Sequence, residues 1–208
     1  MNLPRKDDNG TSYLSYSQIA LFKRSRKEYR DRYIIGEKFE GNAYTDFGSK
    51  VGEAIENNDF SKFKKKEQSV LKKVTRLDEF EREVRLEYDG FYIKGFIDSN
   101  SSDFTHIIDY KTGGKNKEGQ YKLSDYTQLP LYALSLRQET GVTPTVAEVN
   151  FIRRGGNAFR GEKLFVEAED PLMIEVDISY NRLKSVYWGT LLAAKEIARF
   201  YELELKKL

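Results

Sequence analysis

Residues 81–98 hold the feature that most restricts the fold: two runs of alternating apolar and polar residues joined by the dipeptide Asp89-Gly90. Alternation with a period of two is typical of a β-strand with one buried face, and Asp-Gly is a strong turn signal. The segment therefore predicts an antiparallel hairpin with strands over residues 81–88 and 91–98. Residues 104–111 have an almost continuous apolar centre, which predicts a third strand covered on both faces.

Other patterns surround this meander with helices and further strands. The chain has 208 residues, enough for one domain of generous size, and shows no repeat or linker. We expect one mixed α/β domain over residues 1–208, with residues 1–11 flexible and the basic run 60–74 either helical or partly mobile. The expected helices cover 15–33, 47–57, 124–141 and 179–207, with strands at 146–153 and 163–167.

Composition excludes several classes of protein. Apolar residues make up 39% of the chain, which argues against disorder. Charged residues make up 33%, the mean hydropathy is −0.67, and no apolar run is long enough for a signal core or a membrane span. Zero cysteines exclude disulfides, thiolate metal sites and iron–sulfur clusters, and fit a cytoplasmic location. With a net charge of only +2, binding to nucleic acid would need locally concentrated cations.

Three charged residues lie at the ends of the expected strands. Asp109 and Lys111 are two apart on one strand and so share a face, while Tyr110 points the other way. That pair alone is more often a structural salt bridge. Asp98 closes the preceding strand, and two carboxylates that approach each other repel unless a cation lies between them. Mg²⁺ or Mn²⁺ would fit, and such ions promote phosphodiester hydrolysis, with Lys111 placing the attacking hydroxide or stabilising phosphate charge.

At these residues the chain resembles a known family. "GFID" and "IIDYKTG" are similar to the second and third motifs of the RecB-like branch of the PD-(D/E)XK nucleases. The resemblance implies a restriction-endonuclease-like core in which a central mixed sheet, a meander plus a strand-helix-strand unit, is flanked by helices. It implies metal ligands at Asp98, Asp109 and the main-chain carbonyl of Tyr110, with Lys111 as the catalytic lysine.

The resemblance extends over residues 12–136. "QLPLYAL" is similar to the family's Gln-x-x-x-Tyr motif, which adds Gln128 and Tyr132 to the candidate catalytic residues. Two departures stand out. Where many relatives carry Cys-Pro in the opening helix, this chain has Ser25-Arg26, so no iron–sulfur cluster is expected.

The second departure concerns the family's first motif, which often reads Gly-x-x-x-His-x-x-x-Glu. The stretch "GSKVGEAIE" keeps Gly48 and Glu56 but has Gly52 at the histidine position. Glu56, or Glu53 on a neighbouring part of the same helix, could fill the gap directly or through water. We assign Glu56 as the further metal ligand.

Contacts with DNA should come from Lys and Arg side chains. The run 62–66 is more simply a solvated face, the loop after Lys111 either contacts DNA or is mobile, and most aromatics, Trp188 included, are expected in the core. The single histidine, His106, is expected to be a packed or hydrogen-bonded strand residue. The DNA-binding candidates are Lys23, Arg24, Lys27, Arg30, Lys115, Lys117, Arg153 and Arg154.

These observations predict a Mg²⁺- or Mn²⁺-dependent deoxyribonuclease, in first place an exonuclease acting on single-stranded or duplex DNA ends in recombination, repair or replication. A partner from those processes is compatible with this function, and a phage-encoded protein would act in the host cytoplasm. The alternatives are a structure-specific endonuclease and a nuclease-like module that binds DNA or protein without catalysis, for which Gly52 is the best evidence. A preference for RNA stays open because the metal chemistry does not read the sugar.

Overall fold

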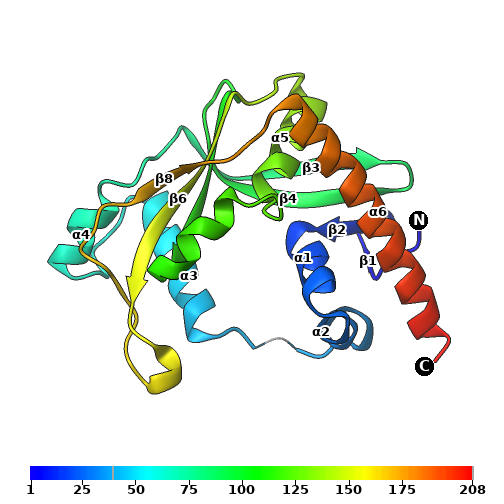
Figure 1. The fold of residues 1–208 in the computed structure, drawn as a ribbon, viewed down its shortest axis with the longest axis horizontal. Coiled ribbons are helices and arrows are strands. Elements are labelled where there is room, and N and C mark those ends of the chain that lie inside the picture. Colours follow the sequence, from blue (N-terminus) through cyan, green and yellow to red (C-terminus); the bar gives the residue numbers. More distant parts are fainter. Residues whose placement is uncertain (39, 208) are drawn as a thin grey trace.

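An eight-stranded mixed β-sheet organises the computed structural model, which describes residues 1–38 and 40–207 (Figure 1). The order along the sheet is β1-β2-β4-β5-β6-β7, with β3 paired to β4 and β8 paired to β6. The strands are β1 (Arg5–Lys6), β2 (Ser12–Ser15), β3 (Glu79–Tyr88), β4 (Phe91–Asn100), β5 (His106–Gly113), β6 (Val146–Gly155), β7 (Phe165–Val166) and β8 (Leu172–Glu175).

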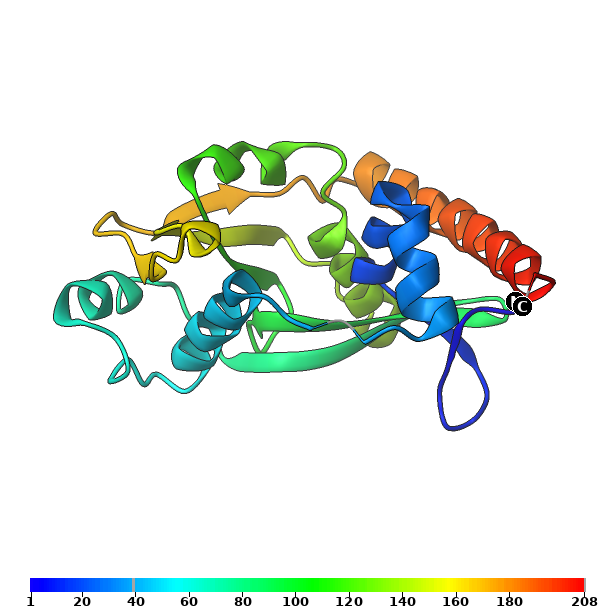
Figure 2. The ribbon, with the colours of Figure 1, turned by 90° about the horizontal axis from the view of Figure 1, so that it is seen from below.

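The helices form two groups around this sheet. Figures 1 and 2 both show α3 and α4 at one end of the molecule and α1, α2 and α6 at the other. The α-helices are α1 (Tyr16–Arg24), α2 (Arg26–Arg30), α3 (Ala43–Glu56), α4 (Lys65–Leu71), α5 (Gln128–Thr140) and α6 (Tyr180–Leu205). Shorter helical turns are η1 (Asp31–Ile35), η2 (Lys115–Lys122) and η3 (Ala158–Arg160).

Two apolar layers enclose β5. Ile107 and Phe151 pack with Leu129 of α5 in one layer, whereas Tyr110 and Ile152 pack with α3 and α4 in the other. This arrangement follows from the two-residue period of a strand, because successive side chains enter opposite layers. The sheet is therefore covered on both faces at the strand that carries Asp109 and Lys111, which agrees with the apolar run in the sequence.

The hairpin and the fold class predicted from sequence are confirmed. β3 and β4 pair antiparallel from Glu79↔Asn100 to Tyr88↔Phe91, and Gly90 in the connecting turn has a φ of 78°, which favours glycine. β5 then pairs parallel with β6, as expected for strands joined by a helical crossover. The last helix begins after Ser179, whose side chain accepts a hydrogen bond from the Arg182 N–H.

The expected first helix is wrong in one respect, because it is broken at Ser25. There the backbone is extended, with φ −156° and ψ 102°, and the serine side chain accepts a hydrogen bond from the Glu28 N–H to begin α2. The hydrogen bond to the Ser25 side chain therefore starts a new helix, although the apolar periodicity favoured one continuous helix. Strands β2 and β8, four residues each, were not predicted, since their pairing with β4 and β6 depends on distant parts of the chain.

The first residues of the chain, expected to be flexible, make contacts with the sheet. Leu3 is 1% exposed within an apolar cluster, and Arg5–Lys6 pairs with β2. The backbone N–H of Asn9 and that of Thr11 donate to the Asp7 carboxylate and close the loop between the two strands.

One face of α6 packs against the rest of the molecule, and the opposite face of this helix is exposed to solvent. Leu183, Val186 and Ile197 are buried, but Trp188 is 54% exposed, so the expectation that Trp188 lies in the core is wrong. Among the helices of residues 1–38 and 40–207, none combines the length and apolar composition needed to cross a membrane.

Candidate active site

The candidate site lies where β4 and β5 part. These strands pair only at Ser99↔Ile108 and Asn100↔Ile107, and the same register places Asp98 opposite Asp109 directly beyond the last pair. The Tyr110 N–H donates to Asp98 Oδ2 at 2.7 Å. A carboxylate thus takes the place of a strand partner, and the sheet opens between the two aspartates.

Asp109 is held from two directions. It is 0% exposed, and Lys111 Nζ lies 2.8 Å from its Oδ1 and 2.7 Å from its Oδ2. The Tyr126 hydroxyl donates to Oδ2 at 2.9 Å. Asp109 and Lys111 share a face, as the strand period predicts, while the Tyr110 hydroxyl reaches the Thr75 carbonyl in the opposite layer at 2.8 Å. The geometry fixes the carboxylate before any ligand arrives.

The charges of this cluster shift its protonation. Burial, with a further contribution from the Asp109 charge, raises the pKa of Asp98 to about 7, although Lys111 and the Tyr110 N–H act in the opposite sense. Burial alone would lower the pKa of Lys111, but Asp109 and Asp98 outweigh it and raise that pKa. One lysine therefore faces two carboxylates that repel each other, and additional positive charge would stabilise the ionised pair.

The donor atoms at the opening suit a hard divalent cation. Asp98 and Asp109 supply carboxylate oxygens, and in an extended strand the Tyr110 carbonyl points to the same side as its N–H, toward Asp98. Within residues 1–38 and 40–207 no three Asp, Glu, His or Cys side chains converge as a preformed cage. The site therefore fits an ion such as Mg²⁺ that keeps several waters, rather than one enclosed by protein.

Helix α3 forms the wall facing Asp98. A cavity of about 380 Å³ is lined by Asp98, Tyr110, Lys111, Phe80 and Glu81 together with Gly48, Ser49, Gly52, Glu53 and Glu56 of α3. A Cβ added at Gly52 would meet no atom within 4 Å, so the place of the family's histidine is open space. Both candidate glutamates, Glu53 and Glu56, line this cavity, and the Glu56 charge contributes to raising the pKa of Glu81. The assignment of Glu56 as a ligand stays a prediction.

Glu81 is a candidate functional residue that sequence reasoning missed. It interrupts the β3–β4 ladder opposite Asp98 and has a φ of 49°, a left-handed conformation that is strained for a residue other than glycine. Burial and the Glu56 charge raise its pKa. In the sequence Glu81 is one polar residue in an alternating strand, and nothing distinguishes it from a solvent-facing glutamate.

The tyrosine of the Gln-x-x-x-Tyr pair lies against the motif glycine, Gly95. Gln128 Nε2 donates to the Tyr132 hydroxyl at 3.0 Å, and burial raises the pKa of Tyr132 to about 12. A Cβ added at Gly95 would collide with the Tyr132 ring, so the glycine of "GFID" is required by this packing. Tyr132 is 6% exposed and supports the site from beneath.

A second opening reaches Lys111 from the α5 side. A cavity of about 470 Å³ is lined by Tyr16, Lys111, Gln120, Tyr121, Leu123, Asp125, Tyr126 and Gln128. Lys111 thus borders both cavities, with its side chain 29% exposed. Tyr126, whose hydroxyl donates a hydrogen bond to Asp109, was also missed. It lies seventeen positions after Asp109, and nothing in the sequence indicates that the two side chains meet.

The predicted DNA-binding residues lie on three parts of the fold: α1 with α2, η2, and the end of β6. On α1 and α2, Lys23 is exposed, whereas the other three bind carboxylates: Arg24 contacts Glu28 at 2.8 Å, Lys27 contacts Asp31 at 2.7 Å and Arg30 contacts Glu204 at 2.6 Å. Lys115 and Lys117 are exposed. They belong to η2, so the segment that was expected to be a loop forms a 3₁₀-helix.

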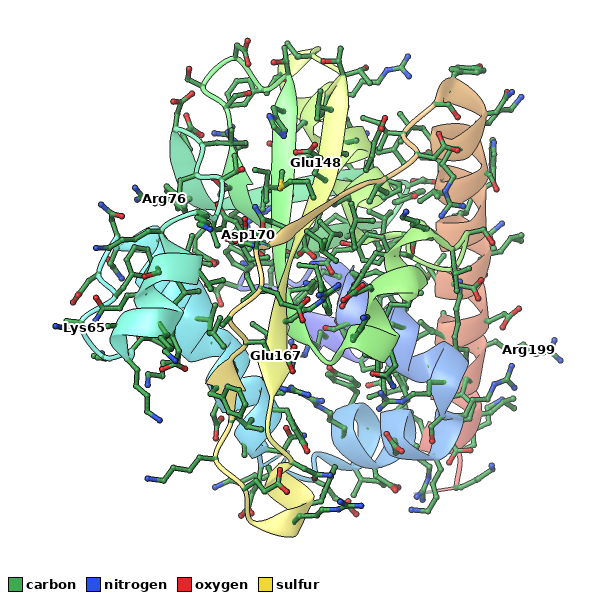
Figure 3. The ribbon with its side chains drawn as sticks, turned by 60° about the vertical axis from the view of Figure 1, so that its left-hand side comes forward. Lys65, Arg76, Glu148, Glu167, Asp170 and Arg199 are labelled. Carbon is green, nitrogen blue, oxygen red and sulfur yellow. The ribbon has the colours of Figure 1, made fainter. Side chains whose placement is uncertain are left out.

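The two arginines at the end of β6 differ from each other. Arg153 forms ion pairs with Glu118 and Glu169, and its side chain is 13% exposed. Arg154 instead places its guanidinium 4.1 Å from the centre of the Tyr44 ring. At the opposite end of β5, His106 Nε2 lies 2.9 Å from Glu148 Oε2, which agrees with a hydrogen-bonded strand residue. Glu148 of β6 is labelled in Figure 3.

Comparison with known proteins was consistent with this geometry. The family model of the PD-(D/E)XK nuclease superfamily matches residues 57–182, a stretch that includes Asp98, Asp109, Lys111 and Gln128 but begins after Glu56. No curated protein matches the chain. A crystal structure from Eubacterium rectale, described as a "putative exonuclease", has the same fold: the TM-score is 0.61 at 16% identity, covering 93% of this chain and 82% of the other. Because the family model covers more than half of the sequence, the chain belongs to the PD-(D/E)XK nuclease superfamily, with the motifs of its RecB-like branch.

Proposed function

We propose that this protein is a divalent-metal-dependent exonuclease that hydrolyses phosphodiester bonds at DNA ends, with Mg²⁺ or Mn²⁺ as the ion. The observation that carries the proposal is the pair Asp98 and Asp109 at the opening between β4 and β5, with Lys111 bonded to Asp109. The Eubacterium rectale protein with the same fold is described as a "putative exonuclease", which favours an exonuclease over other nuclease types in this proposal. The chain would act in the cytoplasm during recombination, repair or replication.

Each residue has a defined task in this reaction. Asp98, Asp109 and the Tyr110 carbonyl would hold the ion, with Glu56 reaching it directly or through water. When bound, the ion supplies positive charge against the scissile phosphate and makes a water molecule more acidic. Lys111, kept protonated by the two aspartates, orients the attacking water and stabilises charge that develops on the phosphate.

Tyr126 and Tyr132 act through other residues. The Tyr126 hydroxyl fixes the orientation of Asp109, and the Tyr132 ring packs on Gly95 beneath the strand that ends in Asp98. Both contacts keep the two aspartates at a constant separation, which electrostatic catalysis requires.

Digestion of end-labelled single-stranded, linear duplex and circular DNA, in Mg²⁺ or Mn²⁺ and with a chelator control, tests the proposal. We expect metal-dependent loss of the linear substrates while circles survive. Cleavage of circles would instead assign an endonuclease. If the protein binds DNA and leaves every substrate intact, the nuclease-like binding module replaces the enzyme.

A further inference from the structure

One aromatic side chain, Phe159, projects into solvent beside the first turn of α3. Phe159 belongs to η3, at the tip of the segment that joins β6 to β7, and it is 89% exposed. In Figures 1 and 3 this tip extends beyond the sheet, and Figure 2 shows it close to α3. A single exposed apolar side chain is ordinary on a protein surface, so exposure alone indicates nothing.

What distinguishes Phe159 is that its turn is fixed to α3. The Ala158 N–H donates to the Tyr44 hydroxyl at 3.1 Å, and that hydroxyl donates to Asn157 Oδ1 at 3.3 Å. The Phe159 N–H also donates to Asn157 Oδ1, at 3.1 Å. The Tyr44 and Phe159 rings lie 5.4 Å apart at 53°. The phenylalanine is thus held toward solvent by a hydrogen-bonded turn, with a second aromatic ring next to it.

Positive charge accompanies the two rings. The Arg154 guanidinium lies over the Tyr44 ring, and its buried Nε has no hydrogen-bond partner among the described residues. From residue 154 to residue 163 the chain carries three basic side chains, Arg154, Arg160 and Lys163, against one acidic side chain, Glu162. Guanidinium groups beside aromatic faces suit a ligand that offers both phosphates and planar rings.

The same helix leads from this pair to the candidate active site. Tyr44, Gly48, Gly52 and Glu56 follow one another at four-residue intervals, which form a single ridge along a helix, and the last three line the cavity at Asp98. Gly48 and Gly52 have no side chain to obstruct this ridge, and at Gly52 the space is open. From Tyr44 to Gly52 the axis advances by about 12 Å at about 1.5 Å per residue. Stacked nucleotides spaced by about 3.4 Å would cover that length in about three to four steps.

We propose that Phe159 and Tyr44 form a stacking site for an unpaired base of the DNA strand being cleaved, about three to four nucleotides from the scissile phosphate. Arg154 and Arg160 contact the phosphates on either side of that base, and the strand runs along the glycine ridge of α3 into the site. This inference rests on the proposed nuclease function and adds to it the form of the substrate: a strand whose end is single-stranded over at least this distance.

The test uses the 208-residue chain carrying Asp109→Asn, which we expect to bind DNA without cutting it, and a short fluorescent single-stranded DNA. Adding Phe159→Ala should weaken binding about 10-fold, the scale of one lost stacked base. Phe159→Trp should retain binding, because the ring is kept. Leu192→Ala serves as the matched control, since Leu192 is also exposed, at 61%, but lies on α6. Equal affinity of Phe159→Ala and its parent would overturn the proposal.

An abasic scan locates the contact. A single abasic position moved along the oligonucleotide should weaken binding at one place, three to four nucleotides from the cleavage point that the active protein defines. At that place the loss should be absent when Phe159→Ala is already present, because both changes remove the same stack. Equal losses with and without Phe159 would overturn the stacking site.

Loss of the stacking site and loss of the nuclease function would give different experimental results. If the wild-type protein cleaves linear DNA and Phe159→Ala neither weakens binding nor alters the abasic profile, the stacking site is wrong and the nuclease stands. If the wild-type protein cleaves no substrate in any metal, the proposed function is wrong, and the stacking site falls with it.

Discussion

The two sides of the candidate site are built in opposite ways. On the β5 side, Asp109 is fully buried and bonded to Lys111 and Tyr126. On the α3 side, Glu53 and Glu56 are exposed, and among the described residues the side chains of Glu53, Glu56 and Glu81 form no hydrogen bond or ion pair. A fixed side can set the geometry of the reaction, whereas an adaptable side can admit a hydrated ion and a DNA strand. If that division is correct, substitutions on the β5 side should mainly lower the cleavage rate, whereas substitutions on the α3 side should mainly lower the affinity for the metal.

The largest effect should come from Asp109→Asn. This change keeps the shape of the side chain but removes the charge that would hold the ion, and we expect the cleavage rate to fall by about 10³-fold or more. Rate measurements on labelled linear DNA would show this, with thermal unfolding as the control for folding. A variant that cleaves at the wild-type rate would remove Asp109 from the active site.

Lys111→Ala should rank next, with a loss of about 10²–10³-fold in kcat, the range for removing one group that stabilises developing charge. Because Lys111 is assigned to the phosphate and the attacking water, the metal concentration needed for half-maximal activity should change little. A metal titration of both proteins separates the two quantities. Equal loss of turnover and metal affinity would contradict the assigned role.

Glu56 and Glu53 provide a matched pair on the adaptable side. Glu56→Gln should weaken the apparent affinity for Mg²⁺ by about 10–100-fold, as expected when a supporting ligand is lost. Glu53→Gln, on the same helix and lining the same cavity, should stay within about 2-fold of the wild type if Glu56 is the ligand. If the two variants exchange places in this measurement, Glu53 is the ligand that replaces the absent histidine.

The smallest effect concerns stability without metal. The pKa of Asp98 is raised to about 7, above its ordinary value of 3.8, so the ionised carboxylate destabilises the folded protein. This penalty is absent at pH values below the unfolded pKa, grows as the pH rises between the two values and is complete above pH 7. Asp98→Asn should therefore stabilise the chelated protein by about 1–2 kcal/mol at pH 8, with the gain shrinking toward pH 4. Thermal melts across that pH range measure it, and a gain that does not vary with pH would argue against the assigned cause.

The parts of the structure that could be predicted are those determined by neighbouring residues. Alternation around Asp89-Gly90 predicted the hairpin, and the two-residue period predicted that Asp109 and Lys111 share a face. The resemblance to a known family predicted that Asp98, Gln128 and Tyr132 lie near Asp109 and Lys111, and the structure has them in that part of the fold. These features depend on local geometry or on motif order, both of which are visible in a sequence.

The features that escaped prediction depend on contacts between distant residues. Glu81 has its left-handed backbone where β3 passes Asp98, and Tyr126 reaches Asp109 from the segment before α5. In the sequence Ser25 occupies an ordinary helical position, whereas in the fold its side chain caps the start of α2. In each case the residue type is common, and its role comes from what folding places beside it.

The hydrogen bond from the Tyr110 N–H to Asp98 makes one amide a natural reporter of the site. An amide in a continuous ladder exchanges its hydrogen with water only when the sheet opens, but this amide is protected by a side chain that can be protonated or drawn toward an ion. Its exchange rate should therefore respond to metal and to pH, while that of Ile108, which pairs with Ser99 of β4 on the same side of the strand, should not. Hydrogen exchange at Tyr110 would therefore report metal binding at the candidate site without any DNA.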